Sequence, residues 1–248
     1  MGFYEDFIEK YDSLISWENR ARRESNFFKE LFLKYKIKTV LDCACGTGQH
    51  VIMFNQMGYR SKGSDLSPAM IKKAKINAKK YRVKTTFKIA DFRKLSEAFN
   101  EKFDAIICIG NSLPHLLTDE DLIKSLNEMY NLLKEKGILI IQQRNYDLLV
   151  GKKKRFFPVS IRADEVFFYV LDYFPNKVVF NVVNLELKPV NFKVYSTEYN
   201  PLKKAHLNKL IQKSGFKNLR WFGDYKFKKF DINNDGDVIV VCEKASLM

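Results

Sequence analysis

The chain of 248 residues is long enough for one large domain with an insertion, but its length argues against two full domains. Its hydrophobic content of 46% can supply a core, and apolar runs such as residues 238–242 are far too short to span a bilayer. Residues 1–6 lack the charged-then-apolar pattern of a signal peptide, so we expect a soluble cytoplasmic protein with no membrane partner.

A formal net charge of +14 raises the question of a nucleic-acid partner. Most of the excess is lysine scattered through predicted helices, as in residues 72–80, which is typical of a solvated helix face. Only residues 152–155 and 226–229 form dense basic clusters, and the second contains an aromatic side chain. We favour a lysine-rich surface and keep RNA or another anion as an alternative partner.

The first part of the chain is predicted to be helical. Residues 3–35 carry apolar side chains at spacings of three and four, which predicts two amphipathic helices. Between them lies the segment of residues 16–20, which ends in Arg20.

A strand, a glycine turn and a helix follow one another directly after this region. Residues 39–43 are predicted to be a buried strand and residues 49–57 a helix. Between them, Gly46 and Gly48 allow a tight turn with positive φ and close approach of a ligand to the backbone. Ala44 stands at the first of the three positions that the dinucleotide-binding fingerprint fills with glycine. The segment therefore predicts a nucleotide-binding turn.

The next elements continue the alternation of strand and helix. The second strand ends at Asp65, which follows Asp42 at the spacing of about 20 residues where a carboxylate binds ribose hydroxyls. Ser67 and Pro68 then open a helix as its N-cap and first residue. Five strands alternating with helices predict a parallel sheet wound on both faces. The further strands expected are residues 59–65, 84–90, 103–109 and 137–143. The further helices are residues 69–80 and 118–133, and the second is expected to have Thr118 or Asp119 as its N-cap.

Beyond residue 155 the periodicity changes. Residues 166–170 and 178–183 are rich in aromatic and β-branched side chains and are separated by Pro175-Asn176, which predicts antiparallel strands. Such an insertion could cover the substrate side of a crevice, or it could be an extra sheet that serves oligomer contacts. After it we expect a helix at residues 201–214 ended by Gly215, and an antiparallel pair of strands at residues 216–222 and 237–243.

Several stretches occur in the order found in one enzyme class. Residues 42–48 (D-C-A-C-G-T-G), 64–70 (S-D-L-S-P-A-M) and 89–92 (I-A-D-F) together resemble class I S-adenosylmethionine-dependent methyltransferases. Residues 108–116 and 144–147 are similar to segments of glycine N-methyltransferases and glycine/sarcosine N-methyltransferases. The resemblance covers roughly residues 15–150 well and the remainder in outline.

This resemblance implies a fold and a domain organisation. The fold is α/β, with a doubly wound, mostly parallel seven-stranded Rossmann-like sheet and an antiparallel β insertion after the fifth strand. The expected units are N-terminal helices over the cofactor site at residues 1–36, the methyltransferase core at 37–150 and 197–248, and the insertion at 151–196.

S-adenosyl-L-methionine is the cofactor that the resemblance implies. Arg20 would grip the carboxylate of its methionine moiety, because a guanidinium meets a carboxylate through two parallel hydrogen bonds; a helix-surface arginine is the alternative. Asp91 would accept from the exocyclic amine of adenine while the Phe92 backbone N–H meets a ring nitrogen, or Asp91 would only cap a turn. The expected cofactor-binding residues are Arg20, Asp42, Ala44, Gly46, Gly48, Asp65, Leu66, Asp91, Phe92, Ile109, Gly110 and Ser112.

Polar side chains at strand ends support one common site. Ligands of doubly wound sheets bind outside the carboxyl ends of the strands, where one crevice can collect residues from several strands. The residues at or just beyond such ends are Asp42, Asp65, Asp91, Asn111 and Arg144.

On the substrate side, Arg144 matches the arginine with which the family holds a substrate carboxylate, and Asn111 matches an asparagine that orients the substrate. A structural ion pair of Arg144 with Asp147 or another nearby acid is the alternative. His115 could touch substrate or cofactor, or be satisfied by the backbone at a helix start. We assign no catalytic residue, because placement of an amine in a water-poor pocket is most of what methyl transfer requires.

Two features differ from the family or remain unassigned. Gln142-Gln143 stand before Arg144 where the family has Asp-His, so the hydrogen bonds that support the arginine differ. The substrate-facing tyrosines of the family cannot be placed by counting, and Tyr195 and Tyr199 are guesses.

We expect no metal site. Residues 231–236 resemble the start of a calcium loop, but Cys242 stands where that loop needs a glutamate. Cys43 and Cys45 lack two further ligands at zinc spacing, and with Cys108 and Cys242 they are expected to be reduced core residues.

The sequence thus predicts an S-adenosylmethionine-dependent N-methyltransferase that acts on a small amino-carboxylate such as glycine or sarcosine. The alternatives are a tRNA or RNA methyltransferase that uses the basic clusters, and a module that binds the cofactor without catalysis. A small-molecule substrate is the expected partner, and a homo-oligomer is left open.

Overall fold

The computed structural model describes residue 8 and residues 17–161 and 164–245. The first of the two predicted N-terminal helices lies outside the described residues apart from residue 8. The second is present as α2 (Trp17–Lys34). Among the described residues, no helix combines the length and the apolar character needed to cross a membrane.

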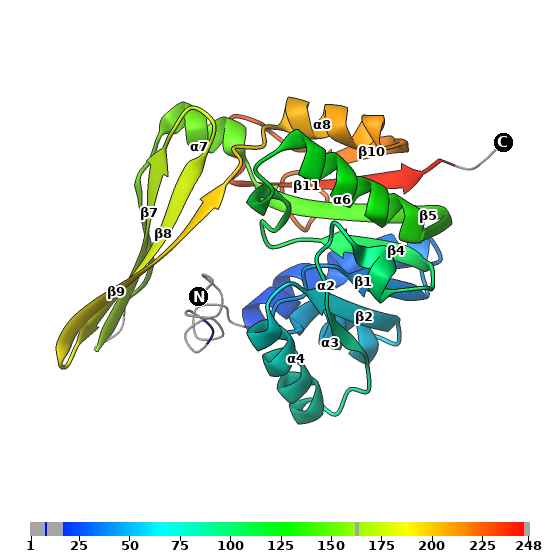
Figure 1. Ribbon diagram of the computed structural model, residues 1–248, viewed down its shortest axis with the longest axis horizontal. Coiled ribbons are helices and arrows are strands. Elements are labelled where there is room, and N and C mark those ends of the chain that lie inside the picture. The colour runs from blue at the N-terminus through cyan, green and yellow to red at the C-terminus, as the bar shows by residue number, and fades with distance from the viewer. Residues whose placement is uncertain (1–7, 9–16, 162–163, 246–248) are drawn as a thin grey trace.

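A seven-stranded sheet forms the centre of the molecule (Figure 1), with the strand order β3-β2-β1-β4-β5-β11-β10. Neighbouring strands from β3 to β5 are parallel, whereas β11 runs antiparallel to both β5 and β10. The mostly parallel seven-stranded sheet that the sequence predicted is therefore confirmed. Its strands are β1 (Thr39–Asp42), β2 (Arg60–Asp65), β3 (Phe87–Ile89), β4 (Phe103–Cys108), β5 (Leu133–Arg144), β10 (Phe216–Phe222) and β11 (Asp237–Lys244).

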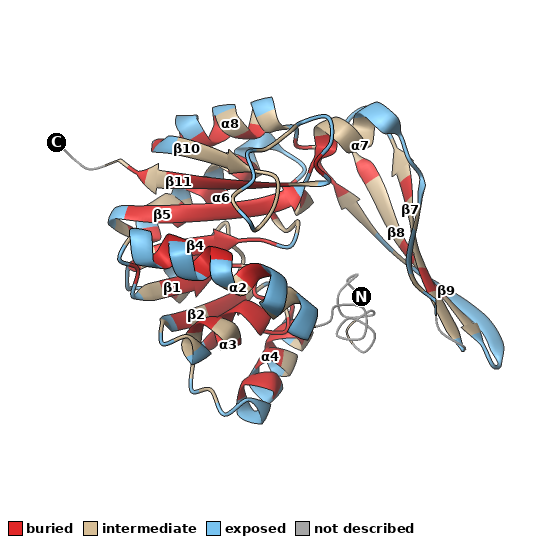
Figure 2. Ribbon diagram, turned by 180° about the vertical axis from the view of Figure 1, so that it is seen from behind, coloured by how far each residue is buried: buried red, intermediate tan, exposed pale blue. Residues whose placement is uncertain are grey.

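Helices cover both faces of this sheet. Successive side chains of a strand point to opposite faces, so Ile106 and Leu139 pack on one side and Ile107 and Ile140 on the other. The first side packs against α5, α6 and α8, the second packs against α2 and α3, and the central strands are buried (Figure 2). The remaining helices are α3 (Gln49–Gln56), α4 (Pro68–Lys80), α5 (Leu95–Ala98), η1 (Leu113–His115), α6 (Asp119–Leu132), α7 (Tyr146–Lys152) and α8 (Lys204–Lys213).

The caps predicted for these helices are present. Ser67 accepts a hydrogen bond from the Met70 backbone N–H at 3.3 Å and begins α4. Thr118 accepts from the Asp121 backbone N–H at 3.2 Å and begins α6. Gly215 follows α8 with φ of 90°, the left-handed conformation expected of a glycine after a helix.

Strand β3 is shorter than the predicted strand at residues 84–90. It is the edge of the sheet, and it pairs with β2 only over Phe87 to Ile89. Strand β5 is longer than predicted and begins at Leu133 rather than at residue 137.

A second sheet follows the fifth strand and extends away from the first as an arm (Figure 1). Its root packs on α7 through Tyr146, Leu171, Val178 and Tyr199. The antiparallel strands predicted here are confirmed, although the last one continues to Tyr199, past the expected boundary at residue 196. The strands of the arm are β6 (Phe156–Ile161), β7 (Glu165–Tyr173), β8 (Val178–Leu187) and β9 (Val190–Tyr199), in that order across the sheet.

Candidate functional site

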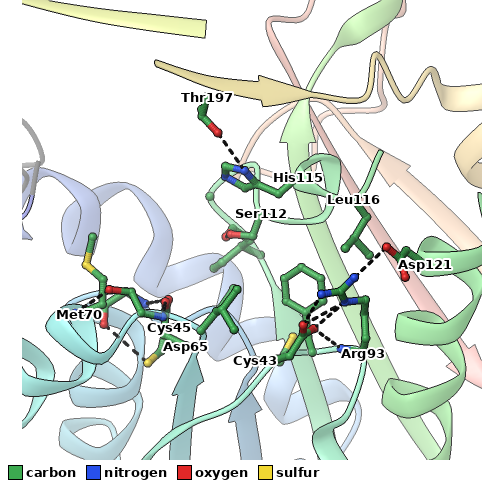
Figure 3. Close-up of a pocket in the computed structure, with 18 of the residues that line it drawn as sticks. Cys43, Cys45, Asp65, Met70, Arg93, Ser112, His115, Leu116, Asp121 and Thr197 are labelled. Carbon is green, nitrogen blue, oxygen red and sulfur yellow. Dashed lines mark hydrogen bonds and ion pairs between the residues drawn. The ribbon is translucent and has the colours of Figure 1, made fainter. Parts of the chain in front are cut away.

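A cavity of about 550 Å³ opens at the carboxyl ends of β1, β2 and β4, beside α2 and η1 (Figure 3). The predicted residues that line it are Arg20, Ala44, Gly46, Asp65, Leu66, Asp91, Phe92, Ile109, Gly110, Ser112 and His115. The predicted residues outside its lining are Asp42, Gly48, Asn111 and Arg144. The lining residues that the sequence did not assign to the site are Cys43, Cys45, His50, Ser67, Met70, Arg93, Leu116, Leu117, Thr118, Asp121 and Thr197.

The glycine turn brings the ends of β1 and β2 together. Gly46 and Gly48 have φ of 52° and 88°, a region that side chains disfavour. The Gly46 backbone N–H donates to the Asp65 carboxylate at 2.8 Å, and the Ser67 N–H donates to it at 3.0 Å. Gly48 lies outside the cavity lining, but a Cβ at this position would lie 3.0 Å from the Phe87 ring. The turn therefore favours glycine there. Asp65 is thereby fixed at the cavity wall, where a carboxylate can bind hydroxyl groups.

Asp42 ends β1 just before the lining residues Cys43 and Ala44, and it is only 1% exposed. Its Oδ1 accepts from the Ala44 backbone N–H at 3.2 Å, while Oδ2 has no hydrogen-bond partner among the described residues. Burial raises the pKa of Asp42 to about 7, the Asp65 charge also raises it, and Arg20 acts in the opposite direction. Oδ2 lies 3.9 Å from His50 Nδ1, too far for a hydrogen bond, so among the described residues this buried oxygen still has room for a donor from a ligand.

Arg20 reaches the cavity from α2 and is held there by a buried group of side chains. Its Nη1 donates to the Gln49 Oε1 at 2.8 Å, and its Nε lies 3.9 Å from the Glu24 carboxylate one helical turn away. Glu24 is 1% exposed and also contacts His50 Nε2 at 2.7 Å and Arg23 Nη2 at 2.6 Å. This arrangement fixes a guanidinium at the end of the cavity nearest the glycine turn.

The charges in this group are set by burial and pairing. Burial opposes ionisation of Glu24, but the hydrogen bond and charge of His50, with the charge of Arg20, outweigh it and lower the pKa of Glu24. Burial lowers the pKa of His50, and the hydrogen bond and charge of Glu24 act in the opposite direction. Glu24 was not predicted from the sequence, although its position four residues after Arg20 places both side chains on one face of the helix.

Asp91 lies at the opposite end of the cavity, after β3. Its carboxylate is paired with Arg93, whose Nε lies 3.0 Å from Oδ1 and 2.9 Å from Oδ2. The same carboxylate accepts from the Arg93 backbone N–H at 2.8 Å, so Asp91 both caps its turn and lines the cavity. Arg93 also donates to Asp121 at the start of α6, at 2.8 Å (Figure 3).

His115 and Thr197 form the side of the cavity that faces the arm. Thr197 lies on β9, and its Oγ1 is 3.5 Å from His115 Nδ1 (Figure 3). The Tyr199 ring packs on the imidazole with 4.6 Å between ring centroids. Burial lowers the pKa of His115 to about 4, so the imidazole is neutral at physiological pH. The arm therefore contributes a residue to the cavity wall. The other guessed tyrosine, Tyr195, packs within the arm.

Arg144 lies at the rim of the site rather than in the cavity lining. Its backbone N–H donates to the Asn111 Oδ1 at 3.0 Å. Its guanidinium, about half exposed, lies 3.2 Å from the Asp237 carboxylate on the neighbouring strand β11. The partner acid is thus Asp237, whereas Asp147 accepts from the Lys204 backbone N–H at 2.8 Å. The role of Arg144 in binding a substrate carboxylate stays a prediction.

Hydrogen bonds order the turn between the cavity and this rim. Asn111 has φ of 65°, and its Nδ2 donates to the buried Tyr146 hydroxyl at 3.0 Å. The Gly110 backbone N–H donates to the Gln142 side chain at 2.7 Å. Gln142, one of the two residues that differ from the family pattern, therefore supports the turn that carries Gly110 into the cavity wall.

The other segments that the sequence singled out lie outside the cavity lining. The Asp231 carboxylate accepts from the Asn233 backbone N–H at 2.9 Å and from the Asn234 side chain at 2.7 Å, so it caps its own loop. Within the basic clusters, Arg155 pairs with Asp172 and Lys228 with Asp235, which reduces their local charge.

Comparison with known proteins finds relatives over almost the whole chain. A family profile described as a methyltransferase domain matches residues 40–137. The glycine/sarcosine N-methyltransferase of Aphanothece halophytica is 34% identical over 228 residues, which cover 90% of this chain and 83% of that protein. The glycine/sarcosine N-methyltransferase of Parasynechococcus marenigrum strain WH8102 is 33% identical over 245 residues, which cover 98% and 84%.

The fold has close matches among solved structures as well. An S-adenosylmethionine-dependent methyltransferase from Clostridium acetobutylicum superposes with a TM-score of 0.82 over 98% of this chain and 99% of that one. The sequence identity to it is 20%, so this likeness concerns the fold. The similarity in fold therefore extends beyond the residues that the family profile matches.

Proposed function

This chain belongs to the S-adenosylmethionine-dependent methyltransferases, in the family of the glycine/sarcosine N-methyltransferases, and from that premise we propose that it methylates the amine of a small amino-carboxylate such as glycine or sarcosine. The observation that carries the proposal is the continuity of one cavity from the glycine turn to His115 and Thr197. A methyl donor held along the sheet edge in that cavity would present its reactive end to the side where the arm meets the core.

The residues of the cavity fit S-adenosyl-L-methionine. Asp42 lies outside the lining, but its buried Oδ2 has no hydrogen-bond partner among the described residues and suits a cationic amino group. The guanidinium of Arg20 in the lining suits a carboxylate. Asp65 suits the ribose hydroxyls, and Asp91 suits the amino group of adenine. When bound, the cofactor supplies a methyl group on a positively charged sulfur, which is already a strong electrophile.

The chain's own contribution is placement and exclusion of water. The acceptor amine has to arrive neutral, because only the neutral form carries the lone pair that attacks. His115 presents a neutral imidazole beside that position, and Thr197 with the Tyr199 ring holds the imidazole in place. Alignment of two reactants in a dry pocket accounts for most of the rate gain expected of such a site.

For the acceptor carboxylate we propose Arg144 as the cation and Asn111 as its support. The Arg144 guanidinium is about half exposed and pairs with Asp237. When a substrate carboxylate arrives, the guanidinium would either leave Asp237 for it or pair with both carboxylates. A free carboxylate can pair with both arms of the guanidinium fork, whereas the contact to Asp237 runs through Nη1 alone.

Two assays test this function. Titration calorimetry with S-adenosylhomocysteine tests the cofactor site, and no binding at millimolar concentration would reject it. A methyl-transfer assay over glycine, sarcosine and simple amines without a carboxylate tests the acceptor. We expect Arg144→Gln to raise the KM for glycine by about 10-fold or more, since a charge-assisted pair is lost, and to leave a simple amine unaffected. Unchanged kinetics on glycine would reject the clamp.

The same assays address the alternatives. A tRNA substrate would give methylated RNA whose yield falls steeply with added salt, because phosphate contacts release counterions. Cofactor binding without methylated product from any metabolite extract would support a non-catalytic module. A cytoplasmic location and a homo-oligomeric state also stay predictions, which cell fractionation and light scattering can test.

A further inference from the structure

The end of the cavity around Asp91 has the form of a slot between two loops. The loop after β3 supplies Asp91 and Phe92 on one side, and the segment after η1 supplies Leu116 and Leu117 on the other. The apolar side chains among them, Phe92, Leu116 and Leu117, suit contact with a flat ring. Because Asp65 marks the ribose position, the base of a bound nucleoside lies in this slot, with its polar edge toward Asp91.

Arg93 connects the two sides of the slot. Its Nε lies within 3.0 Å of both Asp91 oxygens, and its Nη2 donates to Oδ2 at 2.5 Å. Its Nη1 reaches across to the Asp121 carboxylate at 2.8 Å, at the first turn of α6 (Figure 3). One guanidinium thus pairs with the Asp91 carboxylate and ties it to the first turn of α6, which follows the segment that carries Leu116 and Leu117.

This pairing determines what Asp91 can recognise. Burial alone would raise the pKa of Asp91, but the hydrogen bonds and charge of Arg93 lower it below its usual value. An ionised carboxylate only accepts hydrogen bonds, and its two oxygens offer about four lone-pair positions. Arg93 already occupies most of them through its backbone N–H, Nε and Nη2. Three N–H groups of Arg93 thus share the Asp91 carboxylate, which leaves about one acceptor position for a ligand.

We propose that Arg93 is a positioning residue that sets the base selectivity of the cofactor site. It keeps Asp91 as a fixed hydrogen-bond acceptor, which accepts from a 6-amino group and rejects a 6-oxo group in the same place. The inference rests on the cofactor placement proposed above. Asp121 anchors Arg93 from the first turn of α6.

The test compares two ligands that differ only at this position, S-adenosylhomocysteine and S-inosylhomocysteine, by titration calorimetry. The quantity measured is the ratio of the two dissociation constants. We expect wild-type protein to prefer the adenosyl form, and Arg93→Gln to reduce that preference by about 10-fold or more, the value of one hydrogen bond to a charged group. Arg93→Lys keeps the charge without the fork, so its preference should lie between the two.

Asp121→Asn is the matched control. It weakens the anchor across the slot but leaves the contacts between Arg93 and Asp91, so it should lower the affinity for both ligands by the same factor. Circular dichroism and melting curves check that each variant is folded, and Arg93→Lys provides a second variant if Arg93→Gln is not.

The outcomes separate this inference from the function. If Arg93→Gln weakens both ligands equally, or if wild-type protein does not distinguish them, Arg93 is only a structural support and the inference is wrong. If wild-type protein binds neither ligand, the cofactor placement fails as well.

Discussion

Replacement of Asp42 by asparagine should change how the stability of the cofactor-free protein depends on pH. Burial raises the pKa of Asp42 from 3.8 to about 7, so the folded state binds this proton more tightly than the unfolded state does. The stabilisation from the bound proton is therefore complete below pH 3.8 and is lost as pH rises through 7. The full pKa shift corresponds to about 4 kcal/mol of unfolding free energy. About 2.5 kcal/mol of this stabilisation is lost between pH 5 and pH 8.

The prediction concerns the difference between the variant and the wild type. Burial lowers the pKa of His50 and that of His115, and these groups favour the folded state at high pH, so they oppose Asp42 in the wild-type curve. Both proteins share them, so the difference reports Asp42 together with its contact to His50, whose Nδ1 lies 3.9 Å from the Asp42 Oδ2. An asparagine can keep the acceptor for the Ala44 N–H, and any fixed cost of its buried amide is the same at every pH.

Thermal melting without ligand, recorded from pH 5 to pH 8, measures this difference. The variant should gain roughly 5–10 °C in Tm relative to the wild type over that range. Asp104→Asn serves as the control, because Lys134 and Thr39 lower the pKa of Asp104 and its contribution is lost only as pH falls toward 3.8. A constant difference between Asp42→Asn and the wild type would refute the idea that burial of the Asp42 carboxylate raises its pKa.

Three further predictions follow from individual contacts. Asp237→Asn should lower the KM for a carboxylate acceptor by up to about 5-fold without changing kcat, because it frees the Arg144 guanidinium. Initial rates measure this, and a raised KM would mean that Asp237 orients Arg144 instead. Gly63→Ala should lower the free energy of unfolding in urea by about 1–3 kcal/mol, since its Cβ would lie 2.8 Å from a cysteine sulfur. Gly151→Ala, whose Cβ would have nothing within 4 Å, should cost almost nothing, and equal costs for the two variants would contradict this. Glu24→Gln should destabilise the protein by about 3 kcal/mol, because two arginines and a histidine lose a buried anion; unchanged unfolding would show that the cluster is dispensable.

Local patterns in the sequence were enough to predict most of the fold. The alternation of apolar strands with amphipathic helices predicted the doubly wound sheet, because each element has to bury its own apolar face. Ser67, Thr118 and Gly215 marked helix ends through backbone requirements that involve only neighbouring residues. The positions of Gly46 and Asp65 predicted a nucleotide site for a similar reason, since parallel strands place their carboxyl ends at one edge.

Which side chains meet at that edge was decided by the tertiary structure. Arg144 and Asp237 are 93 positions apart and become neighbours only because β11 inserts antiparallel beside β5. Thr197 reaches the cavity because the last strand of the arm returns past η1. The Arg93 side chain pairs with Asp91 and also reaches Asp121 in α6. The sequence by itself determined the strands, the turn and the identity of the polar groups, because those follow from local backbone and burial requirements. The pairing of those groups depends on strand order and side-chain rotamers, which no local pattern specifies.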